Sequence, residues 1–242
     1  MESPDKNSIG FLNKKPNHLR YDFRSTDVDD VAMKITKLIK PNSKVLDVGC
    51  GTGVIAEILK EYTNADVIGI EPDEERVKKA LEKNIVVYND LLTESFFKEH
   101  GQFDYIIFAD VLEHLENPSE ILKIAKKGLK ENGSIIASVP NVAHWFVRID
   151  LLFGNFNYQD CGIMDATHLR WFTRKTIQSF FQTIGFKIEK IDYTININLP
   201  DYKVRIPWRW LPLHVSKRIV RLLAKISSGL FGCQFVIKVT LP

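Results

Sequence analysis

The chain of 242 residues has few cysteines, no long hydrophobic run and little net charge. Its three cysteines are odd in number and widely spaced, which predicts neither a disulfide framework nor a cysteine metal cluster and favours a reducing compartment. No apolar run approaches the roughly 18–20 residues that span a bilayer, and the polar N-terminus lacks the apolar core of a signal peptide. The net charge of +3 gives no general nucleic-acid signature. These absences predict a cytoplasmic protein with no nucleic-acid partner.

The order of the apolar patterns predicts one α/β domain. A hydrophobic content of 45% is enough for a large core. The polar residues 1–25 predict a partly ordered tail, followed by a domain over 26–242. Strand patterns at 45–48, 66–71, 85–88, 103–109 and 134–139 alternate with helix patterns that begin near residues 26, 54, 73, 117 and 173. This alternation predicts a doubly wound, mostly parallel sheet.

Three glycines separate the predicted strand 45–48 from the helix that begins at Val54. Gly49, Gly51 and Gly53 let the backbone approach a ligand without a Cβ in the way. The start of the following helix offers unpaired N–H groups. A strand that turns through glycines into a helix start indicates a site for a nucleoside-bearing ligand.

The residues around these glycines distinguish between classes of ligand. A dinucleotide fingerprint, G-x-G-x-x-G, needs a third glycine where Val54 stands. Asp47 would repel a pyrophosphate but can hold an ammonium group directly or through water. Cys50 serves as a small residue in the loop. Glu71 ends the next strand about 20 residues after the first glycine, where a carboxylate can accept both ribose hydroxyls; the alternative is an ordinary surface glutamate.

Two strings in this half of the chain resemble a known family. D-x-G-x-G-x-G, from Asp47 to Gly53, resembles the first motif of class I S-adenosylmethionine-dependent methyltransferases. Glu113-His114-Leu115 resembles the fourth motif of the ubiquinone-biosynthesis-like branch. The resemblance implies S-adenosylmethionine as the cofactor and a Rossmann-like sheet of seven strands, the last two near 187–191 and 234–240 and antiparallel. It also implies that Asp90 binds the adenine amino group and that the next apolar residues flank the ring.

The cofactor-binding candidates gather at one edge of the predicted sheet. Ligands of open α/β sheets bind beyond the carboxyl ends of the strands, and Asn141 also follows a strand there. The candidates are Asp47, Gly49, Cys50, Gly51, Gly53, Glu71, Pro72, Asp90, Leu91, Ala109 and Asp110.

Two long insertions, about 140–172 and 192–232, should leave this edge and form a lid that selects the acceptor. The first begins with a predicted apolar helix over 140–154. Its strings P-N-V-A-H-W-x-x-R and G-I-x-D-x-T-H-L-R-x-F-T resemble a bacterial and archaeal methyltransferase group associated with surface-glycan and glycolipid assembly. That resemblance implies a sugar or glycolipid acceptor. The substrate-binding candidates are Asn141, Trp145, Arg148 and Arg170; a structural network that caps the fifth strand is the alternative.

The second insertion is aromatic and basic over 205–226. As a helix, 213–226 puts four basic residues on one side and Val215, Ile219, Leu222, Leu223 and Ile226 on the other. One interpretation is peripheral docking on an anionic membrane surface, or on a pyrophosphate-linked lipid substrate. The other is a helix packed on the domain with a solvated charged face.

A hydroxyl acceptor needs a base to take its proton during methyl transfer, and histidine suits that role near neutral pH. His168 ranks first, because Asp165 could orient it, followed by His114 and His144. A magnesium-assisted variant would use Asp110, Asn141 and Asp165. That variant is less favoured, so no metal is expected.

Three functions fit these patterns. The first is O-methylation of a sugar or glycolipid hydroxyl, and the second is methylation of a quinone or secondary metabolite. The third is a non-catalytic S-adenosylmethionine-binding protein, against which an intact cofactor edge argues. A nucleic-acid methyltransferase is a weaker option, because Ala-Asp-Val-Leu stands where an N-P-P-Y signature would follow the fourth strand.

Overall fold

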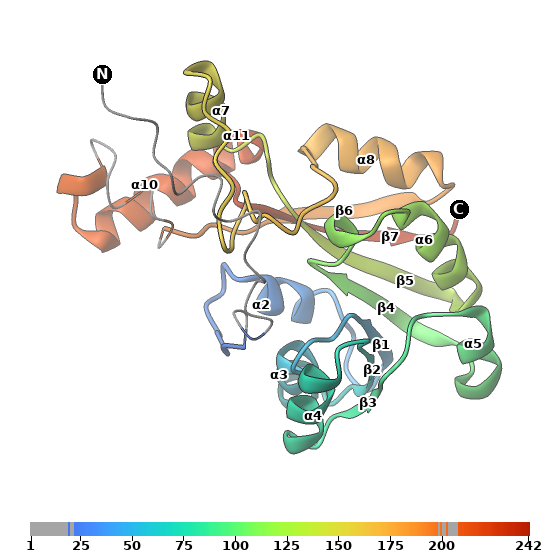
Figure 1. Cartoon of the computed structure of the whole chain (residues 1–242). Coiled ribbons are helices and arrows are strands. Elements are labelled where there is room, and N and C mark those ends of the chain that lie inside the picture. The colour runs from blue at the N-terminus through green and yellow to red at the C-terminus, as the bar shows by residue number, and fades with distance from the viewer. Residues whose placement is uncertain (1–18, 20–21, 198, 200–201, 203–207) are drawn as a thin grey trace.

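The computed structural model describes residues 19, 22–197, 199, 202 and 208–242. Its centre is a seven-stranded sheet in the order β3-β2-β1-β4-β5-β7-β6 (Figure 1). The strands are β1 (Lys44–Val48), β2 (Asp66–Ile70), β3 (Val86–Tyr88), β4 (Phe103–Ala109), β5 (Leu129–Pro140), β6 (Lys187–Tyr193) and β7 (Gln234–Thr240). Strands β1 to β5 are parallel, and β7 lies antiparallel between β5 and β6. The predicted α/β class and the mostly parallel, Rossmann-like sheet are confirmed.

Helices cover both faces of the sheet, because successive strand residues point to opposite sides. On one face, Leu46 and Ile106 share a core cluster with side chains from α5, α6 and α8. On the other face, Val45 and Ile107 pack with side chains from α2, α3 and α4. These helices are α2 (Val31–Thr36), α3 (Val54–Thr63), α4 (Glu74–Glu82), α5 (Glu94–His100), α6 (Pro118–Lys127) and α8 (Arg174–Thr183). The sheet is therefore doubly wound, as predicted.

The fold departs from the predicted elements at several helix ends. The helix predicted from near residue 26 is α2, which begins at Val31, and the helix predicted over 140–154 is α7 (Trp145–Leu152). Helix α6 ends at Lys127 and β5 begins at Leu129, whereas the sequence predicts a helix that continues to Asn132-Gly133. Helix α5, which the sequence analysis did not predict, places Phe97 over Gly128, where an added Cβ would lie 2.0 Å from the ring. The phenyl ring thus covers the backbone at Gly128, and the chain turns there into β5.

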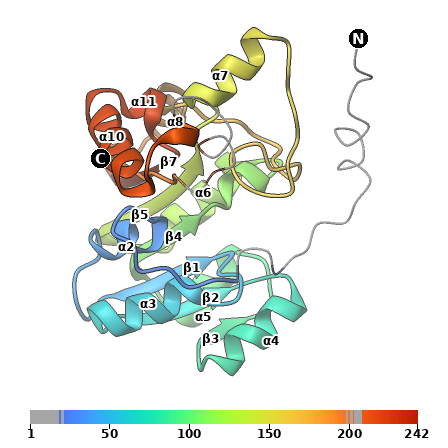
Figure 2. The ribbon, with the colours of Figure 1, turned by 90° about the vertical axis from the view of Figure 1, so that its left-hand side faces the viewer.

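Both predicted insertions leave the carboxyl edge of the sheet, since β5 and β6 point the same way. The first carries α7 (Trp145–Leu152); the second carries η3 (Trp208–Trp210), α10 (Leu213–Ile226) and α11 (Ser228–Phe231). Phe146 and Val147 of α7 share a buried cluster with Val220 and Ala224 of α10. The two insertions form one packed unit beyond the sheet, in the upper part of Figure 2. In the part of the chain that the structure describes, no helix combines the length and the hydrophobicity needed to cross a bilayer.

Candidate active site

The glycine loop between β1 and α3 adopts a conformation that only glycine takes easily. Gly49, Gly51 and Gly53 have φ angles of +69°, +57° and +76°. The N–H of Gly49 donates to the carbonyl of Ile70 at 2.8 Å, which ties the loop to the end of β2. A Cβ built on Gly51 meets nothing within 4 Å. The predicted loop is therefore present, with open space beside its middle glycine.

Two buried carboxylates lie beside this loop. Asp47 is 1% exposed, and its Oδ2 has no hydrogen-bond partner among the described residues. Burial, followed by the charge of Glu71, raises the pKa of Asp47 to about 7. Glu71 is 2% exposed and accepts from the N–H of Gly51 at 2.9 Å and of Asp73 at 3.1 Å. An unsatisfied buried carboxylate oxygen fits a ligand with an ammonium group, so these residues fit an amino-acid-bearing nucleoside.

The predicted adenine side of the site lies at the end of β3 and is open to solvent. Asp90 is exposed and accepts from the N–H of Leu91 at 2.7 Å; Leu91 is itself 64% exposed. Pro72 is exposed at the start of the next loop. Asn89, which the sequence analysis did not select, donates to the carbonyls of Glu71 at 3.0 Å and Pro72 at 2.9 Å. It holds the ends of β2 and β3 together.

Cys50 fills space rather than offering a reactive group. Its Sγ packs over Gly69 of β2, where an added Cβ would lie 2.5 Å from the sulfur. Burial, followed by the charge of Asp47, raises the pKa of the Cys50 thiol. The prediction of a small residue in the loop agrees with this packing.

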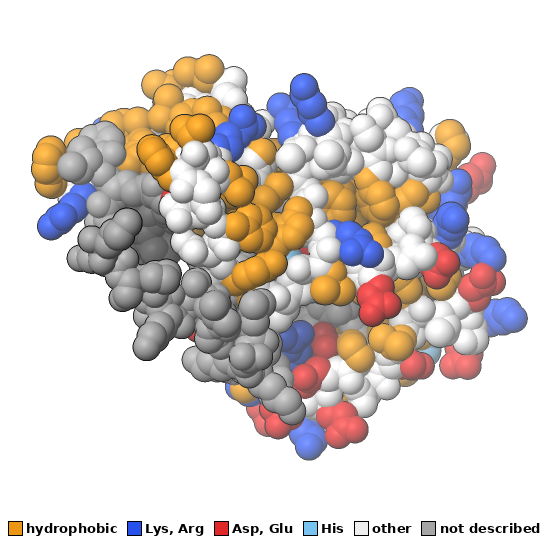
Figure 3. All heavy atoms as spheres, turned by 45° about the horizontal axis from the view of Figure 1, so that its top comes forward, with side chains coloured by type: hydrophobic (Ala, Val, Ile, Leu, Met, Phe, Trp, Pro, Cys, Tyr) orange, Lys and Arg blue, Asp and Glu red, His pale blue; other side chains and the backbone are white. Residues whose placement is uncertain are grey.

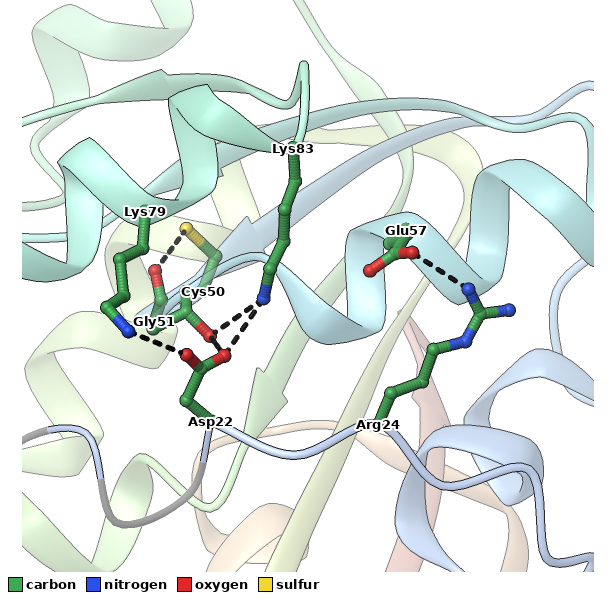
Figure 4. A network of polar contacts seen from close by, with 8 residues as sticks. Asp22, Arg24, Cys50, Gly51, Glu57, Lys79 and Lys83 are labelled. Carbon is green, nitrogen blue, oxygen red and sulfur yellow. Dashed lines mark hydrogen bonds and ion pairs between the residues drawn. The ribbon is translucent and has the colours of Figure 1, made fainter.

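The segment 22–25, which the sequence assigns to the tail, is bound to the glycine loop and to α3 and α4 (Figure 4). The carboxylate of Asp22 accepts from Thr52 Oγ1 at 2.6 Å, from Lys83 at 2.9 Å and from Lys79 at 3.1 Å. These contacts, that of Thr52 first, hold the pKa of Asp22 well below its ordinary value. Arg24 pairs with Glu57 at 2.8 Å. Residues 22–25 are thus held on the domain by side-chain contacts, while most of the predicted tail lies outside the described residues.

Asp110 connects three strands at the end of β4. It has a φ of +54°, and its carboxylate accepts from Ser138 Oγ of β5 at 2.7 Å and from Gln234 Nε2 of β7 at 2.8 Å. Burial raises the pKa of Asp110, against the effect of these two hydrogen bonds. The preceding residue, Ala109, is half-buried. Both predicted residues thus lie at the cofactor edge, and Asp110 is held rigidly.

The segment after Asp110 contacts the glycine loop and continues into His114, one of the predicted histidines. Val111 packs against Gly49, whose added Cβ would lie 2.8 Å from Val111 Cγ2. His114 follows in the short helix η2 (Leu112–His114). His168 comes from the first insertion, and the ring centroids of the two histidines are 4.9 Å apart. The fold brings His114 and His168 together, three residues along the chain from Val111 in the case of His114.

Hydrogen bonds to the backbone orient both rings. Nδ1 of His114 lies 3.2 Å from the carbonyl oxygen of Thr167, and Nδ1 of His168 lies 3.2 Å from that of Ile163. Because a carbonyl oxygen only accepts, we assign the proton of each neutral ring to Nδ1. In that tautomer the lone pair is on Nε2.

Asp165 reaches His114 through Thr167. The Oγ1 of Thr167 donates to Asp165 Oδ1 at 2.7 Å and lies 3.3 Å from His114 Nδ1. The prediction that Asp165 orients His168 stays a prediction. The contacts of Thr167 connect Asp165 with His114. Thr167 was not selected from the sequence, although it stands between two residues that were.

Glu113 adds a buried carboxyl group to the two histidines. It is 1% exposed, and neither side-chain oxygen has a hydrogen-bond partner in the described part of the chain. Burial, followed by the charge of Asp110, raises the pKa of Glu113 well above its ordinary value. Glu113, His114 and His168 each offer a ligand atom, all within 4.8 Å of one another. Although the sequence predicts no metal, this set could hold a divalent cation.

Asn141 has a structural role instead of the predicted substrate or metal contact. It is fully buried, and its Nδ2 donates to the carbonyls of Gly232 at 2.8 Å and Gly229 at 3.1 Å. Its Oδ1 accepts from the N–H of Ala143 at 3.1 Å. The side chain fastens the end of β5 to the loop before β7. The alternative considered from the sequence, a network that caps the fifth strand, describes it.

His144 and Trp145 also belong to the packed interior of the insertions. His144 is 1% exposed, and burial lowers its pKa to about 3. Its Nε2 lies 3.5 Å from the hydroxyl of Tyr202, to which Trp145 Nε1 donates at 3.1 Å. A buried imidazole with so low a pKa is a weak base, so this placement disfavours the predicted catalytic role of His144. The packing of Trp145 likewise favours a structural role over substrate binding.

The two predicted substrate-binding arginines are exposed and bound to backbone carbonyls. Arg148 Nε donates to the carbonyl of Ala143 at 2.7 Å. Arg170 donates to the carbonyls of Leu169 at 2.9 Å and of Glu116. None of these contacts joins either arginine to an acidic side chain. Their role in substrate binding stays a prediction.

Comparison with known proteins identifies the family. A family model described as a methyltransferase domain matches residues 20–191. A ubiquinone biosynthesis O-methyltransferase from Glaesserella parasuis is 33% identical over 137 residues, which are 52% of this chain and 56% of the relative. The mitochondrial ubiquinone biosynthesis O-methyltransferase of Rattus norvegicus is 25% identical over 212 residues, 81% of this chain and 59% of the relative. The matched region spans a little over half the length of these curated relatives.

The fold is also shared with solved structures. A SAM-dependent methyltransferase from Archaeoglobus fulgidus has a TM-score of 0.59 at 22% identity, over 86% of this chain and 92% of that one. A SAM-dependent methyltransferase from Thermotoga maritima, described as a possible histamine N-methyltransferase, has a TM-score of 0.57 at 17% identity, over 87% of each chain. Since the family match covers most of the chain and includes the glycine loop and its two carboxylates, the chain belongs to the methyltransferase domain family, the class I S-adenosylmethionine-dependent methyltransferases.

Proposed function

We propose that this chain transfers the methyl group of S-adenosylmethionine to a hydroxyl oxygen of a sugar or glycolipid acceptor. The observation that carries the proposal is the pair His114 and His168, whose ring centroids lie 4.9 Å apart and whose Nδ1 atoms each lie beside a backbone carbonyl. The curated relatives named above are O-methyltransferases, which favours oxygen as the acceptor atom.

The cofactor would be held by the residues at the ends of β1, β2 and β3. Asp47 would bind the ammonium group of the cofactor, Glu71 would bind the ribose hydroxyls, and Asp90 would bind the adenine amino group. Gly51 has no side chain, so it leaves space for the cofactor beside the loop. When bound, S-adenosylmethionine supplies an electrophilic methyl group on its sulfonium. The task of the protein is then to align the acceptor oxygen with that group, because in-line displacement depends on alignment.

Removal of the proton from the acceptor hydroxyl is the second task of the site. A hydroxyl is a poor nucleophile until its proton leaves, and a positioned base contributes about 10²- to 10⁴-fold to such a step. We assign the base to Nε2 of His168 or His114. Thr167 and Asp165 act on His114 as positioning residues, because they fix its ring through Nδ1.

A divalent cation on Glu113, His114 and His168 is a second version of the same chemistry. The buried carboxyl group of Glu113, which has no hydrogen-bond partner among the described residues, favours it, since removing such a group from water without a partner is costly. The Nε2 atoms would then be ligands, and the cation would acidify the acceptor hydroxyl. Removal of metal separates the two versions.

A quinone-like phenol is the second candidate acceptor. The relatives from Glaesserella parasuis and Rattus norvegicus, both named ubiquinone biosynthesis O-methyltransferases, favour it. The sugar or glycolipid acceptor is favoured instead by the first insertion, whose strings resemble the glycan-associated group. Both acceptors can carry a lipid, so their chemical headgroups must be compared directly.

The test is transfer of labelled methyl from S-adenosylmethionine to both classes of acceptor, presented at equal concentration. We expect label on the sugar or glycolipid, and loss of transfer in His168→Asn or His114→Asn with cofactor binding retained. Label on the phenol alone would replace the acceptor class. Binding of the cofactor without transfer to any hydroxyl, phenol or amine would leave the non-catalytic alternative.

A further inference from the structure

The packed unit of the two insertions exposes large apolar side chains. Of the seventeen large hydrophobic residues that are exposed in the described chain, ten lie in the insertions. At the end of α7, Leu152 is 80% and Phe153 75% exposed; on α10, Leu222 is 60% and Ile226 77% exposed. The two helices share one buried cluster, so these side chains are carried by a single rigid unit. Figure 3 shows hydrophobic side chains gathered in the upper left of the view, where α7 and α10 lie. A clustered apolar surface of this kind marks an interaction site.

Helix α10 packs on the domain through its small residues. The side chains that it buries are Ser216, Val220 and Ala224, four residues apart on one face. The sequence predicts that the face containing Leu222 and Ile226 would be the apolar side, and the structure turns these two residues away from the domain. Helix α10 therefore packs on the domain through one face, while its outer face carries apolar side chains in addition to charged ones.

Basic side chains accompany the exposed apolar ones. Residues 208–242 contain no Asp or Glu. Two basic residues of α10 are used within the domain, since Lys217 pairs with Asp27 and Arg221 with Asp29. Arg218 and Lys225 are exposed beside Leu222 and have no acidic partner within the described residues. The outer face of α10 is thus both basic and apolar.

We propose that the outer face of α10, together with the end of α7, docks on an anionic phospholipid bilayer. Negative headgroups complement Arg218 and Lys225, and the acyl boundary takes up Leu222, Ile226, Leu152 and Phe153. One helix of this length binds reversibly, so the protein would exchange between membrane and solution. The docking goes beyond the proposed methyl transfer and does not depend on it. It would, however, place the carboxyl edge of the sheet beside a membrane, within reach of a lipid-linked acceptor.

The test is co-sedimentation of the full chain with vesicles of phosphatidylcholine alone and of phosphatidylcholine mixed with phosphatidylglycerol. We expect binding to the anionic vesicles only, weakened by salt. The double variant R218E/K225E should bind at least about tenfold more weakly, because each surface charge contributes on the order of 1 kcal/mol. The matched control K78E/K123E changes the net charge equally on α4 and α6, where both lysines are exposed, and should bind like the original protein.

The apolar contribution is tested by L222N/I226N, with Leu81→Asn as its control, since Leu81 is 54% exposed on α4. We expect L222N/I226N to lose vesicle binding while its melting temperature and its calorimetric affinity for S-adenosylhomocysteine stay unchanged. Those two readouts show that the variant is folded, and they do not depend on methyl transfer. The proposal is overturned by equal binding to neutral vesicles, by unchanged binding of R218E/K225E, or by no binding to any vesicle. A lipid-independent dimer that dissociates in L222N/I226N would assign the surface to a second copy instead.

Discussion

The backbone N–H of Gly51 donates a hydrogen bond of 2.9 Å to Oε2 of Glu71. The glutamate at the end of β2 thereby holds the middle of the glycine loop at the end of β1. The residue predicted to recognise the ribose of the cofactor is also the one that shapes the loop beside it. Loss of the carboxylate should therefore affect the affinity for the cofactor more than a surface charge would.

Substitution of Glu71 tests this relationship. We expect Glu71→Gln to weaken binding of S-adenosylhomocysteine by about 10- to 100-fold, the loss typical of hydrogen bonds to a charged group. Glu74→Gln, an exposed change at the start of α4, is the matched control. Isothermal calorimetry measures both affinities. An unchanged affinity in Glu71→Gln would remove Glu71 from the cofactor site.

Asp47 should make cofactor binding depend on pH. Its pKa is raised to about 7, so the carboxyl group is mostly neutral near pH 6 and cannot hold an ammonium group well there. We expect the affinity for S-adenosylhomocysteine to rise as the pH increases from about 6 to 7.5. In Asp47→Asn, the affinity should be lower at the upper pH and nearly constant across this range. Calorimetry at each pH is the measurement.

The raised pKa of Asp47 also makes stability depend on pH, and stability should fall with rising pH where the affinity for the cofactor rises. The folded protein keeps a proton on Asp47 that the unfolded chain releases above its ordinary value of 3.8. The ligand-free protein should therefore lose stability as the pH rises from about 4 to 7, and Asp47→Asn should lose less. Denaturant unfolding checks this, and an equal pH dependence in both proteins would contradict the assignment.

The histidine pair should carry the proton transfer. We expect His168→Asn or His114→Asn to lower kcat by about 10²- to 10⁴-fold with little change in cofactor affinity. His214→Asn, an exposed change on α10, should retain full activity. Steady-state rates with the best acceptor, with and without added imidazole, are the measurement. Full activity in both single variants would exclude a histidine base.

His144 should affect stability rather than catalysis. Its pKa is lowered to about 3 by burial, so the unfolded chain takes up a proton below about pH 6.5 that the folded protein excludes. The original protein should therefore lose stability as the pH falls from about 6.5 toward 3. His144→Gln cannot bind that proton, so it should show a weaker acid dependence and should retain methyl transfer where it is folded. Unfolding curves at several pH values test this; a large fall in kcat without loss of stability would restore the catalytic role.

Metal removal separates the two versions of the proton step. In the part of the chain that the structure describes, both oxygens of Glu113 lack a hydrogen-bond partner and two imidazoles lie near them. We therefore expect Mn²⁺ to bind to chelator-treated protein and to raise its melting temperature. Glu113→Gln should abolish that rise, whereas Glu116→Gln, on the exposed side of the same turn, should not. Calorimetry and thermal melting are the measurements. An absence of binding, together with a chelator-insensitive rate, would favour the histidine base.

Local features of the sequence were sufficient to predict the fold and the cofactor edge. Strand and helix periods are short-range patterns, and their alternation restricts the sheet to few arrangements. The glycines of the loop and the acidic residues at the ends of β1 and β2 likewise lie within a few residues of the strands that position them. Gly51 and Glu71, both selected from the sequence, are neighbours joined by a hydrogen bond, while the roles of Asp47, Gly51 and Glu71 toward the cofactor stay predictions.

The tertiary structure decided the roles of side chains in the insertions. His114 meets His168, and Asp165 reaches His114 through Thr167, only because the first insertion folds back onto η2. Asn141, a plausible ligand by its type, is occupied by backbone carbonyls from a loop about ninety residues away. The sequence determined which residues line the cofactor edge, because strand ends fix them locally. Which residues of the insertions are buried depends on long-range packing, as the small buried face and the exposed leucines of α10 illustrate.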